Sequence, residues 1–287
     1  MLKALENSDA AVIFILGQSN AHAHEQFLRE EEKITTPLKN VFSLDRNPNQ
    51  TLHPDGVVWG GYTTAGKNLA ETQDHTCCFA YNFAKMWQGA IDGGARLPDL
   101  YIVQISIGSQ GIKNGMWNKN KSECLVPGRL GTVDISLYPM CIRMSHAVMR
   151  DLRARFKNIA VLGIQWLGSE QDAHPGGYTS EDFCGLYDDF FREIPAAIGE
   201  NTPVCIYRLS CYKFSDTKEW ADGIAAVNAE LDRQAGLHGF EVTSAENSPF
   251  WDESSPTLGV FAPDNAHYLA KVQHWFAERY FNEITKE

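Results

Sequence analysis

The feature that most constrains this sequence is an apolar run near its start that ends in a turn. Residues 11–16 read Ala-Val-Ile-Phe-Ile-Leu, and Gly17-Gln18-Ser19-Asn20 follow directly. Six apolar residues, rich in β-branched and aromatic types, are typical of a strand buried on both faces of a parallel sheet. The run is too short to span a membrane, and Gly17 allows a sharp turn. Ser19 is therefore expected at the carboxyl end of a strand, where open α/β sheets place their ligands.

Four later segments are also apolar enough to form buried strands, and helical patterns lie between them. The expected strands are 100–107, 159–167, 204–209 and 240–243, and the expected helices are 79–91, 138–156, 179–198, 217–235 and one after 267. Strands that alternate with helices favour a parallel sheet with right-handed crossovers. We predict an α/β fold in one domain, residues 1–287: a doubly wound, flavodoxin-like, five-stranded parallel sheet with helices on both faces. Residues 18–78 have no clear period, which is typical of a segment around a functional site.

Charge and cysteine content exclude several classes of function. The formal charge of −11 argues against nucleic acid as a partner and favours a neutral substrate, such as a small molecule, over a polyanionic one. The seven cysteines lack the spacing of a zinc site and are expected to be reduced thiols in a cytoplasmic protein without a signal peptide. His22 and His24 are the weak alternative for a metal. No metal, cofactor or membrane association is expected, and the sequence does not indicate an oligomeric state.

Polar turns follow three of the expected strands, and an Asp-x-x-His pair lies near the C-terminus. Ser19 follows the first strand, the glycine-rich turn that begins at Gly108 follows the second, and the polar turn 168–172 follows the third. Asp264 and His267 precede the last helix. A serine nucleophile needs a base, and the base needs a third group that fixes its tautomer. Ser19 and Asp264 are also suitable helix caps. Because these turns converge on one edge of a doubly wound sheet, together they favour a catalytic set.

These motifs resemble the SGNH/GDSL hydrolase superfamily. The resemblance rests on four blocks: Gly17-Gln18-Ser19-Asn20, Gly108-Ser109-Gln110-Gly111-Ile112 with Trp117, Trp166-x-x-x-Glu170-x-Asp172, and Asp264-x-x-His267. Within the superfamily the chain is similar to the sialate O-acetylesterase and acetylxylan-esterase-like branch, carbohydrate esterase family 6. The resemblance implies a serine esterase that removes O-acetyl groups from a carbohydrate, such as sialic acid or a xylan-like glycan.

The resemblance also assigns roles to individual residues. It implies that Ser19 is the nucleophile, His267 the base and Asp264 the orienting acid, and that the N–H groups of Ser19 and Gly108 form the oxyanion hole. Substrate contacts are expected from six residues of the matched blocks: Gln18, Asn20, Gln110, Trp117, Glu170 and Asp172. Trp59 and Tyr62 are further candidates for stacking on a sugar, with a place in the core as the alternative.

The third block departs from the family pattern. The family has Trp-x-Gln-Gly-Glu-Ser-Asp, and its glutamine side chain donates to the oxyanion; here Gly168 and Ser169 stand at the glutamine and glycine positions. We expect Gln171 or Ser169 to take over as the third donor, because an oxyanion hole is often the largest single contribution to such catalysis. Ser109 replaces a second family glycine.

Two other functions are compatible with the sequence. A catalytically silent glycan-binding module on the same fold would explain the altered third block. An α/β-hydrolase esterase would explain Gly17-Gln18-Ser19-Asn20-Ala21, which is one residue short of the nucleophile-elbow motif. That elbow normally follows several strands, whereas Ser19 follows the first, and its acid and histidine normally lie on separate loops.

Overall fold

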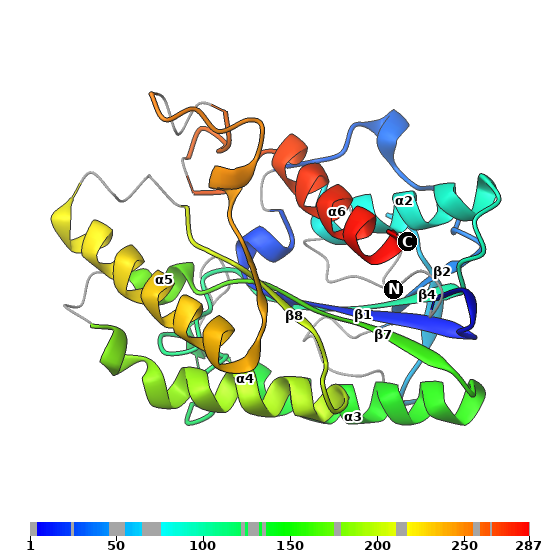
Figure 1. Ribbon diagram of the computed structural model, residues 1–287, viewed down its shortest axis with the longest axis horizontal. Helices are drawn as coiled ribbons and strands as arrows, with labels where there is room; N and C mark the ends of the chain where they lie inside the picture. Colours follow the sequence, from blue (N-terminus) through cyan, green and yellow to red (C-terminus); the bar gives the residue numbers. More distant parts are fainter. Residues whose placement is uncertain are drawn as a thin grey trace.

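Strand β1 (Ala10–Gly17) lies inside a sheet that has seven strands in the described part of the computed structural model (Figure 1). The structure describes residues 5–23, 26–45, 55–64, 76–121, 124–125, 132–133, 136–174, 179–210, 217–254, 259–264 and 266–286. The strand order is β3-β2-β4-β1-β7-β8-β9. The other strands are β2 (Val41–Leu44), β3 (Trp59–Gly61), β4 (Asp99–Ser106), β7 (Ile159–Leu167), β8 (Val204–Tyr207) and β9 (Glu241–Thr243). All neighbouring pairs are parallel except β2 and β3, which are antiparallel.

The predicted fold class is confirmed, but the predicted number of strands is wrong. All five expected strands form, as β1, β4, β7, β8 and β9, and the described residues add β2 and β3 to the same sheet. Both extra strands come from the segment 18–78, where the sequence has no clear period. They contain four and three residues, too few to give a recognisable alternation, and β2 is held by its parallel pairing with β4. A separate short pair, β5 (Cys124–Leu125) and β6 (Thr132–Val133), is antiparallel.

The helices form two layers that cover the two faces of the sheet. They are α2 (Phe79–Asp92), α3 (Leu137–Arg155), α4 (Cys184–Ile198), α5 (Lys218–His238) and α6 (Ala270–Thr285), each close to an expected helix. Figure 1 shows α2 and α6 on one side of the sheet and α3 and α4 on the other. Short 3₁₀ turns stand at η1 (Ser19–Ala21), η2 (Glu30–Glu32), η3 (Glu170–Ala173), η4 (Ser180–Asp182) and η5 (Ala245–Asn247).

The alternation of side chains along β1 explains why the sheet has a core on each face. All eight residues of β1 are buried. Val12, Phe14 and Leu16 pack with side chains from α3, α4 and α5, while Ile13 and Ile15 pack with side chains from α2 and α6. Burial of one such side chain contributes about 1.5–3 kcal/mol, so this strand alone stabilises both layers strongly.

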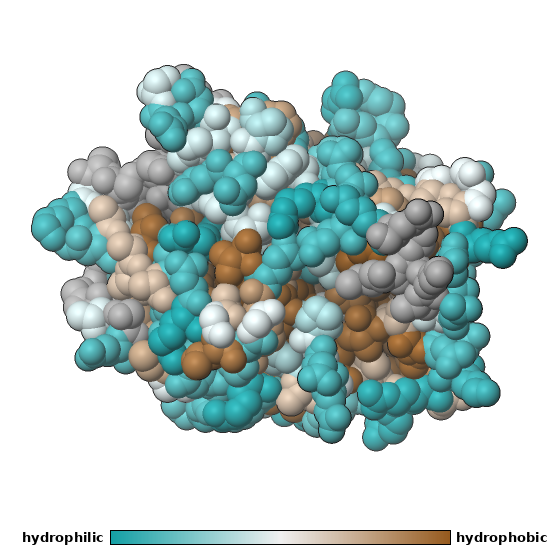
Figure 2. Space-filling view, in the orientation of Figure 1, coloured by the Kyte–Doolittle hydropathy of each residue, from teal (hydrophilic) through white to brown (hydrophobic). Residues whose placement is uncertain are grey.

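The visible surface of the protein is mostly hydrophilic. Figure 2 shows hydrophilic residues around most of the visible face, with hydrophobic residues gathered in hollows toward its centre. In the described part of the chain, none of the helices has the length and apolar character needed to cross a membrane.

Burial raises the pKa of the Cys78 thiol to about 11, which keeps this thiol protonated and unreactive at neutral pH.

Candidate active site

A pocket of about 270 Å³ opens at the carboxyl edge of the sheet and contains the predicted nucleophile, base and acid. The turns after β1 and β4, the 3₁₀ turn η3 after β7, the start of α5 and the loop before α6 supply its walls. The lining residues are Gln18, Ser19, Asn20, Ser109, Glu170, Gln171, His174, Trp220, Asp264, Ala266 and His267. The structure thus brings Ser19, Asp264 and His267, which lie at opposite ends of the sequence, to one cavity.

Gly17 makes the turn that delivers Ser19. Gly17 has a φ of +149°, a backbone conformation that residues with a side chain rarely adopt. A Cβ atom built on Gly17 would also lie 2.0 Å from the carbonyl oxygen of Leu167 at the end of β7. The Gln18 N–H donates to that same carbonyl oxygen at 3.0 Å. Ser19 then begins η1, whose last residue, Ala21, accepts a hydrogen bond of 2.8 Å from the Gln104 side chain of β4. Ser19 is consequently fixed between the ends of three neighbouring strands.

The loop before α6 holds His267 through Asp264. One carboxylate oxygen, Oδ1, accepts the N–H groups of Ala266 and His267 at 3.0 and 3.1 Å, and Oδ2 contacts Nδ1 of His267. Burial opposes ionisation of Asp264, but these donors outweigh it and hold the pKa of the carboxyl below its ordinary value. An ionised Asp264 keeps the proton of a neutral imidazole on Nδ1, which leaves Nε2 of His267 as the proton acceptor.

Asn20 joins the serine turn to the rest of the pocket. Its Nδ2 donates to Oε1 of Glu170 at 2.7 Å and to the carbonyl of Ala266 at 3.2 Å. Its Oδ1 accepts the N–H of Tyr268 at 3.1 Å, and its backbone oxygen accepts from Gln273 at 2.8 Å. Burial raises the pKa of Glu170. Asn20 and Glu170 line the pocket, as expected, and their hydrogen bonds also determine how its walls fit together.

Gly108 lies directly beside Ser19. A Cβ atom on Gly108 would lie in ordinary van der Waals contact, 3.8 Å from Cβ of Ser19 and 3.9 Å from Cε1 of His22, which places this turn against the predicted nucleophile. The next residue, Ser109, has a left-handed φ of +59° and lines the pocket. The oxyanion hole predicted from the N–H groups of Ser19 and Gly108 is compatible with this placement and stays a prediction.

The structure separates the two candidates for a third oxyanion donor. Ser169 is buried with a φ of +87°, and its Oγ accepts a hydrogen bond of 3.2 Å from Nε1 of Trp166. Gln171 lines the pocket, and its N–H donates to Oε1 of Gln18 at 3.3 Å. At Gly168 a Cβ atom would lie 2.8 Å from the Trp166 ring, so the glutamine of the family pattern does not fit without movement. Gln171 is the candidate that the geometry favours.

Three predicted substrate contacts belong to the framework instead. Asp172 is buried, and its carboxylate accepts N–H groups of Ile112, Lys113 and Asn114 at 2.7–3.0 Å and the Tyr187 hydroxyl at 2.8 Å. Gln110 is buried and braces its own loop between Gly108 and Met116. Trp117 is buried, donates from Nε1 to the carbonyl of Gly17 at 3.0 Å and packs against Trp166 and Phe190. The expectation of direct contact is therefore corrected: these side chains position the turns that form the pocket.

The expected stacking residues are also elsewhere. Tyr62 is buried in the core, and Trp59 packs edge-on against Tyr101, with its Nε1 donating to Asp151 at 2.9 Å. The aromatic residue that does line the pocket is Trp220 on α5, next to His174. Sequence reasoning missed both because Trp220 stands in the first turn of a helix and His174 in a loop, and neither position carries a motif.

The structure describes only one of the two histidines that are the weak alternative for a metal. Nδ1 of His22 lies 3.4 Å from the Ser106 hydroxyl, and the ring is buried. His24 lies outside the described residues. Among the residues that the structure describes, His, Cys, Asp and Glu side chains do not form a group suited to a metal ion.

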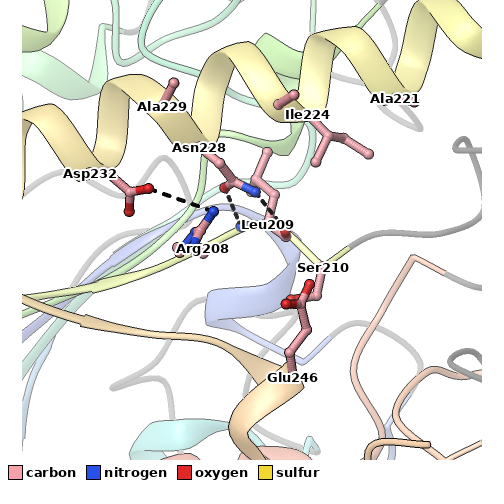
Figure 3. Close-up of a pocket in the computed structure, with 10 residues that line it drawn as sticks. Arg208, Leu209, Ser210, Ala221, Ile224, Asn228, Ala229, Asp232 and Glu246 are labelled. Carbon is pink, nitrogen blue, oxygen red and sulfur yellow. Dashed lines mark hydrogen bonds and ion pairs between the residues drawn. The ribbon is translucent and has the colours of Figure 1, made fainter. Parts of the chain in front are cut away.

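A second cavity, of about 410 Å³, lies between α5 and the end of β8 (Figure 3). Its apolar side comes from α5, including Ala221, Ile224 and Ala225. Two pairs of its polar groups bind one another. The side-chain amide of Asn228 accepts the N–H of Leu209 and donates to its carbonyl oxygen, and Arg208 pairs with Asp232 at 3.6 Å. Neither Ser19 nor His267 lines this cavity.

Comparison with known proteins defines the class of fold. No model of a known protein family and no curated protein sequence matches the chain. Solved structures do match along nearly its whole length, and one of them is a carbohydrate acetylesterase. The resemblance found in the sequence is thus confirmed at the level of the fold, which is that of the SGNH hydrolases.

Three of these structures are the most informative. A protein from Arabidopsis thaliana has a TM-score of 0.57 at 13% identity and covers 95% of this chain and 98% of its own. NanS has a TM-score of 0.57 at 15% identity, with 97% of each chain covered. A carbohydrate acetylesterase from Xanthomonas citri has a TM-score of 0.56 at 14% identity; 96% of this chain matches 56% of that protein, so the chain spans about half its length.

Proposed function

We propose that this protein is a serine esterase that removes O-acetyl groups from a carbohydrate, with Ser19, His267 and Asp264 as its catalytic triad. One observation carries the proposal: Ser19 lines the same pocket as a histidine whose Nδ1 is held by a carboxylate. That arrangement supplies a nucleophile, a base and an orienting acid. The printed name of the Xanthomonas neighbour, a carbohydrate acetylesterase, supports the choice of substrate class.

The proposed reaction proceeds in two steps through an acyl-enzyme. Nε2 of His267 takes the proton of the Ser19 hydroxyl while Oγ attacks the carbonyl carbon of the ester. The tetrahedral intermediate then releases the alcohol, which receives the proton from His267. A water molecule gives its proton to His267 and attacks the acetyl group on Ser19. Acetate leaves, and the proton returns to Ser19.

The developing charge on the carbonyl oxygen is stabilised by N–H donors. The proposed donors are the backbone groups of Ser19 and Gly108, with the side chain of Gln171 as the third. Asp264 stabilises the imidazolium that forms at each proton transfer, and its lowered pKa keeps it ionised at neutral pH. Donors of this kind act without reorganising during the reaction, which is why they contribute strongly.

The two alternatives fit less well. An α/β-hydrolase elbow is at odds with a fold in which Ser19 follows β1 and one short loop supplies both Asp264 and His267. A silent glycan-binding module would have no need for the buried hydrogen bonds that Asn20 makes to the loop of His267. Turnover of p-nitrophenyl acetate distinguishes the proposed esterase from a silent module.

The test is active-site labelling with a fluorophosphonate, read by mass spectrometry of the peptides. We expect a single label on Ser19, no label on Ser19→Ala, and loss of p-nitrophenyl acetate turnover in that variant. Ser109→Ala is the matched control, because Ser109 is the other serine on the pocket wall and this variant is expected to be labelled at Ser19. A label on another residue, or full turnover by Ser19→Ala, refutes the proposal.

A further inference from the structure

One wall of the catalytic pocket is aromatic. Trp220, in the first turn of α5, and His174, just after η3, line the pocket together, with ring centroids 4.9 Å apart and planes inclined by 55°. This wall is rigid because α5 packs tightly on η3: a Cβ atom on Gly223 would lie 2.2 Å from the carbonyl oxygen of Ala173. The two rings therefore stand in a fixed position relative to Glu170 and Gln171 of η3.

We propose that His174 and Trp220 form the subsite for an uncharged sugar ring that bears the acetyl ester. An indole offers a large flat apolar surface at low entropic cost, which suits the face of a pyranose that carries C–H bonds. The amide side chain of Gln18, which also lines the pocket, suits a hydroxyl group at the edge of such a ring. This subsite deepens the proposed esterase function and rests on it.

The charge of the pocket selects a neutral sugar over an acidic one. Asp264 lines the pocket with a lowered pKa and is ionised at neutral pH, and among the described residues the lining includes neither Lys nor Arg. An anionic sugar would approach this carboxylate in a partly buried site, where repulsion is poorly screened. A neutral acetylated glycan, of the xylan type rather than the sialic acid type, is the substrate class that this lining fits.

The neighbouring cavity provides a matched control on the same helix. Trp220 lines the catalytic pocket, whereas the next residue, Ala221, lines the second cavity (Figure 3). Ala225, one turn further along α5, also lines the second cavity. Substitution of Ala225 by leucine reduces the space in the second cavity and leaves the aromatic wall untouched. The pair of variants thus distinguishes the two cavities as places for the sugar.

The experiment measures kcat/KM on three esters: an acetylated xylo-oligosaccharide, an O-acetylated sialic acid, and ethyl acetate, which has no ring to stack. We expect the wild-type protein to prefer the xylo-oligosaccharide to the sialic acid. Trp220→Ala should lower the ratio of xylo-oligosaccharide to ethyl acetate activity at least tenfold, mostly through KM. Trp220→Phe should recover most of the ratio, and Ala225→Leu should keep it.

Three results would overturn the subsite. Equal losses on both esters in Trp220→Ala would give Trp220 a structural role, a lowered ratio in Ala225→Leu would place the sugar in the second cavity, and preference for the sialic acid would contradict the charge argument. If no ester is hydrolysed, the esterase function fails separately. Titration with unacetylated xylotriose, read by tryptophan fluorescence, then tests the subsite alone: binding that Trp220→Ala weakens supports it, and no binding overturns it.

Discussion

The side-chain amide of Asn20 donates a hydrogen bond of 2.7 Å to the carboxyl of Glu170, 150 positions further along the chain. The same side chain binds the carbonyl of Ala266 and the N–H of Tyr268. One residue beside the proposed nucleophile therefore connects the turn after β1, the turn after β7 and the loop of the proposed base. Partly buried networks of this kind are costly to break, because each lost partner leaves a polar group unsatisfied.

Because the carboxyl of Glu170 is buried, we expect Glu170→Gln to stabilise the protein by an amount that depends on pH. Burial raises its pKa, and Oε2 is buried without a hydrogen-bond partner among the described residues. Folding therefore opposes the ionisation of Glu170. Stability is lost as pH rises from the ordinary carboxyl pKa of about 4.3 through the raised pKa of the folded protein. A glutamine keeps the bond to Asn20 and avoids this cost. The difference in Tm between the variant and wild type should grow as pH rises from 4 to 8.

Thermal unfolding across that pH range, followed by circular dichroism, checks this prediction. Glu246→Gln is the control, because Glu246 is exposed and the Tm difference between this variant and wild type should stay nearly the same at every pH. A difference that stays constant between pH 4 and 8 would contradict the assigned cause.

Asp264→Asn should lower kcat/KM strongly while the fold is kept. An amide at this position can donate to Nδ1 of His267, which favours the wrong tautomer, and it no longer stabilises the imidazolium; in a serine protease the same change costs on the order of 10⁴-fold. Steady-state kinetics on p-nitrophenyl acetate measures the loss. A variant within threefold of wild type would remove Asp264 from the proposed triad.

The same carboxyl has a stability signature of the opposite sign to that of Glu170. Its folded pKa is lowered, so its contribution is present above the ordinary aspartate value of about 3.9 and is lost as pH falls through the lowered value. The Tm difference between wild type and Asp264→Asn should accordingly shrink below pH 4. A Tm difference that widens below pH 4 would show that the variant loses stability for a reason other than the hydrogen bonds to the ionised carboxylate.

Gln171 and Ser169 should respond differently to alanine. Gln171 lines the pocket, so Gln171→Ala should lower kcat tenfold or more with little change in KM if its side chain reaches the oxyanion. Ser169 binds Trp166 in the core, so Ser169→Ala should lower Tm and leave kcat near the wild-type value. Steady-state kinetics on p-nitrophenyl acetate measures the effect on kcat, and thermal melts measure the effect on Tm. The reverse pattern would make Ser169 the donor.

Gly17→Ala should be among the most damaging substitutions in the chain. The added Cβ would lie 2.0 Å from a backbone oxygen of β7, and backbone cannot move aside as a flexible side chain can. Overpacking typically costs about 1–3 kcal/mol, and a clash with backbone belongs at the upper end of that range, a large part of the stability of a typical domain. Chemical denaturation measures it. Gly89→Ala is the control, because a Cβ on that helical glycine has open space and should be neutral or stabilising.

The sequence predicts the strands of this fold best where they are buried on both faces. The runs that became β1, β4 and β7 are continuous and apolar, so their position was readable without a partner. Strands β2 and β3 have no such pattern, because pairing with a preformed sheet edge is what makes Val41–Leu44 extended. The position of β2 is therefore determined by the strand with which it pairs, and the residues of β2 alone do not reveal it.

The same distinction applies to the site. Ser19, Asp264 and His267 stand in compact motifs, so the sequence alone could assign them to one cavity. Whether a polar residue faces the cavity or the framework depends on contacts from distant segments, and for this reason the roles expected for Asp172 and Trp117 were wrong. Trp220 carries no local signal at all, because only the packing of α5 on η3 brings it to the pocket.

The hydrogen bonds from Asn20 to the loop before α6 also set an order of events during synthesis. The turn that carries Ser19 leaves the ribosome early, but the partners Ala266, Tyr268 and Gln273 of Asn20 are more than 240 residues away. A nascent chain therefore carries the proposed nucleophile without its proposed base until the loop that contains Asp264 and His267 has been translated and has docked. A chain truncated before Asp264 would lack both the proposed base and its orienting acid, so we expect it to be inert even if its sheet were intact.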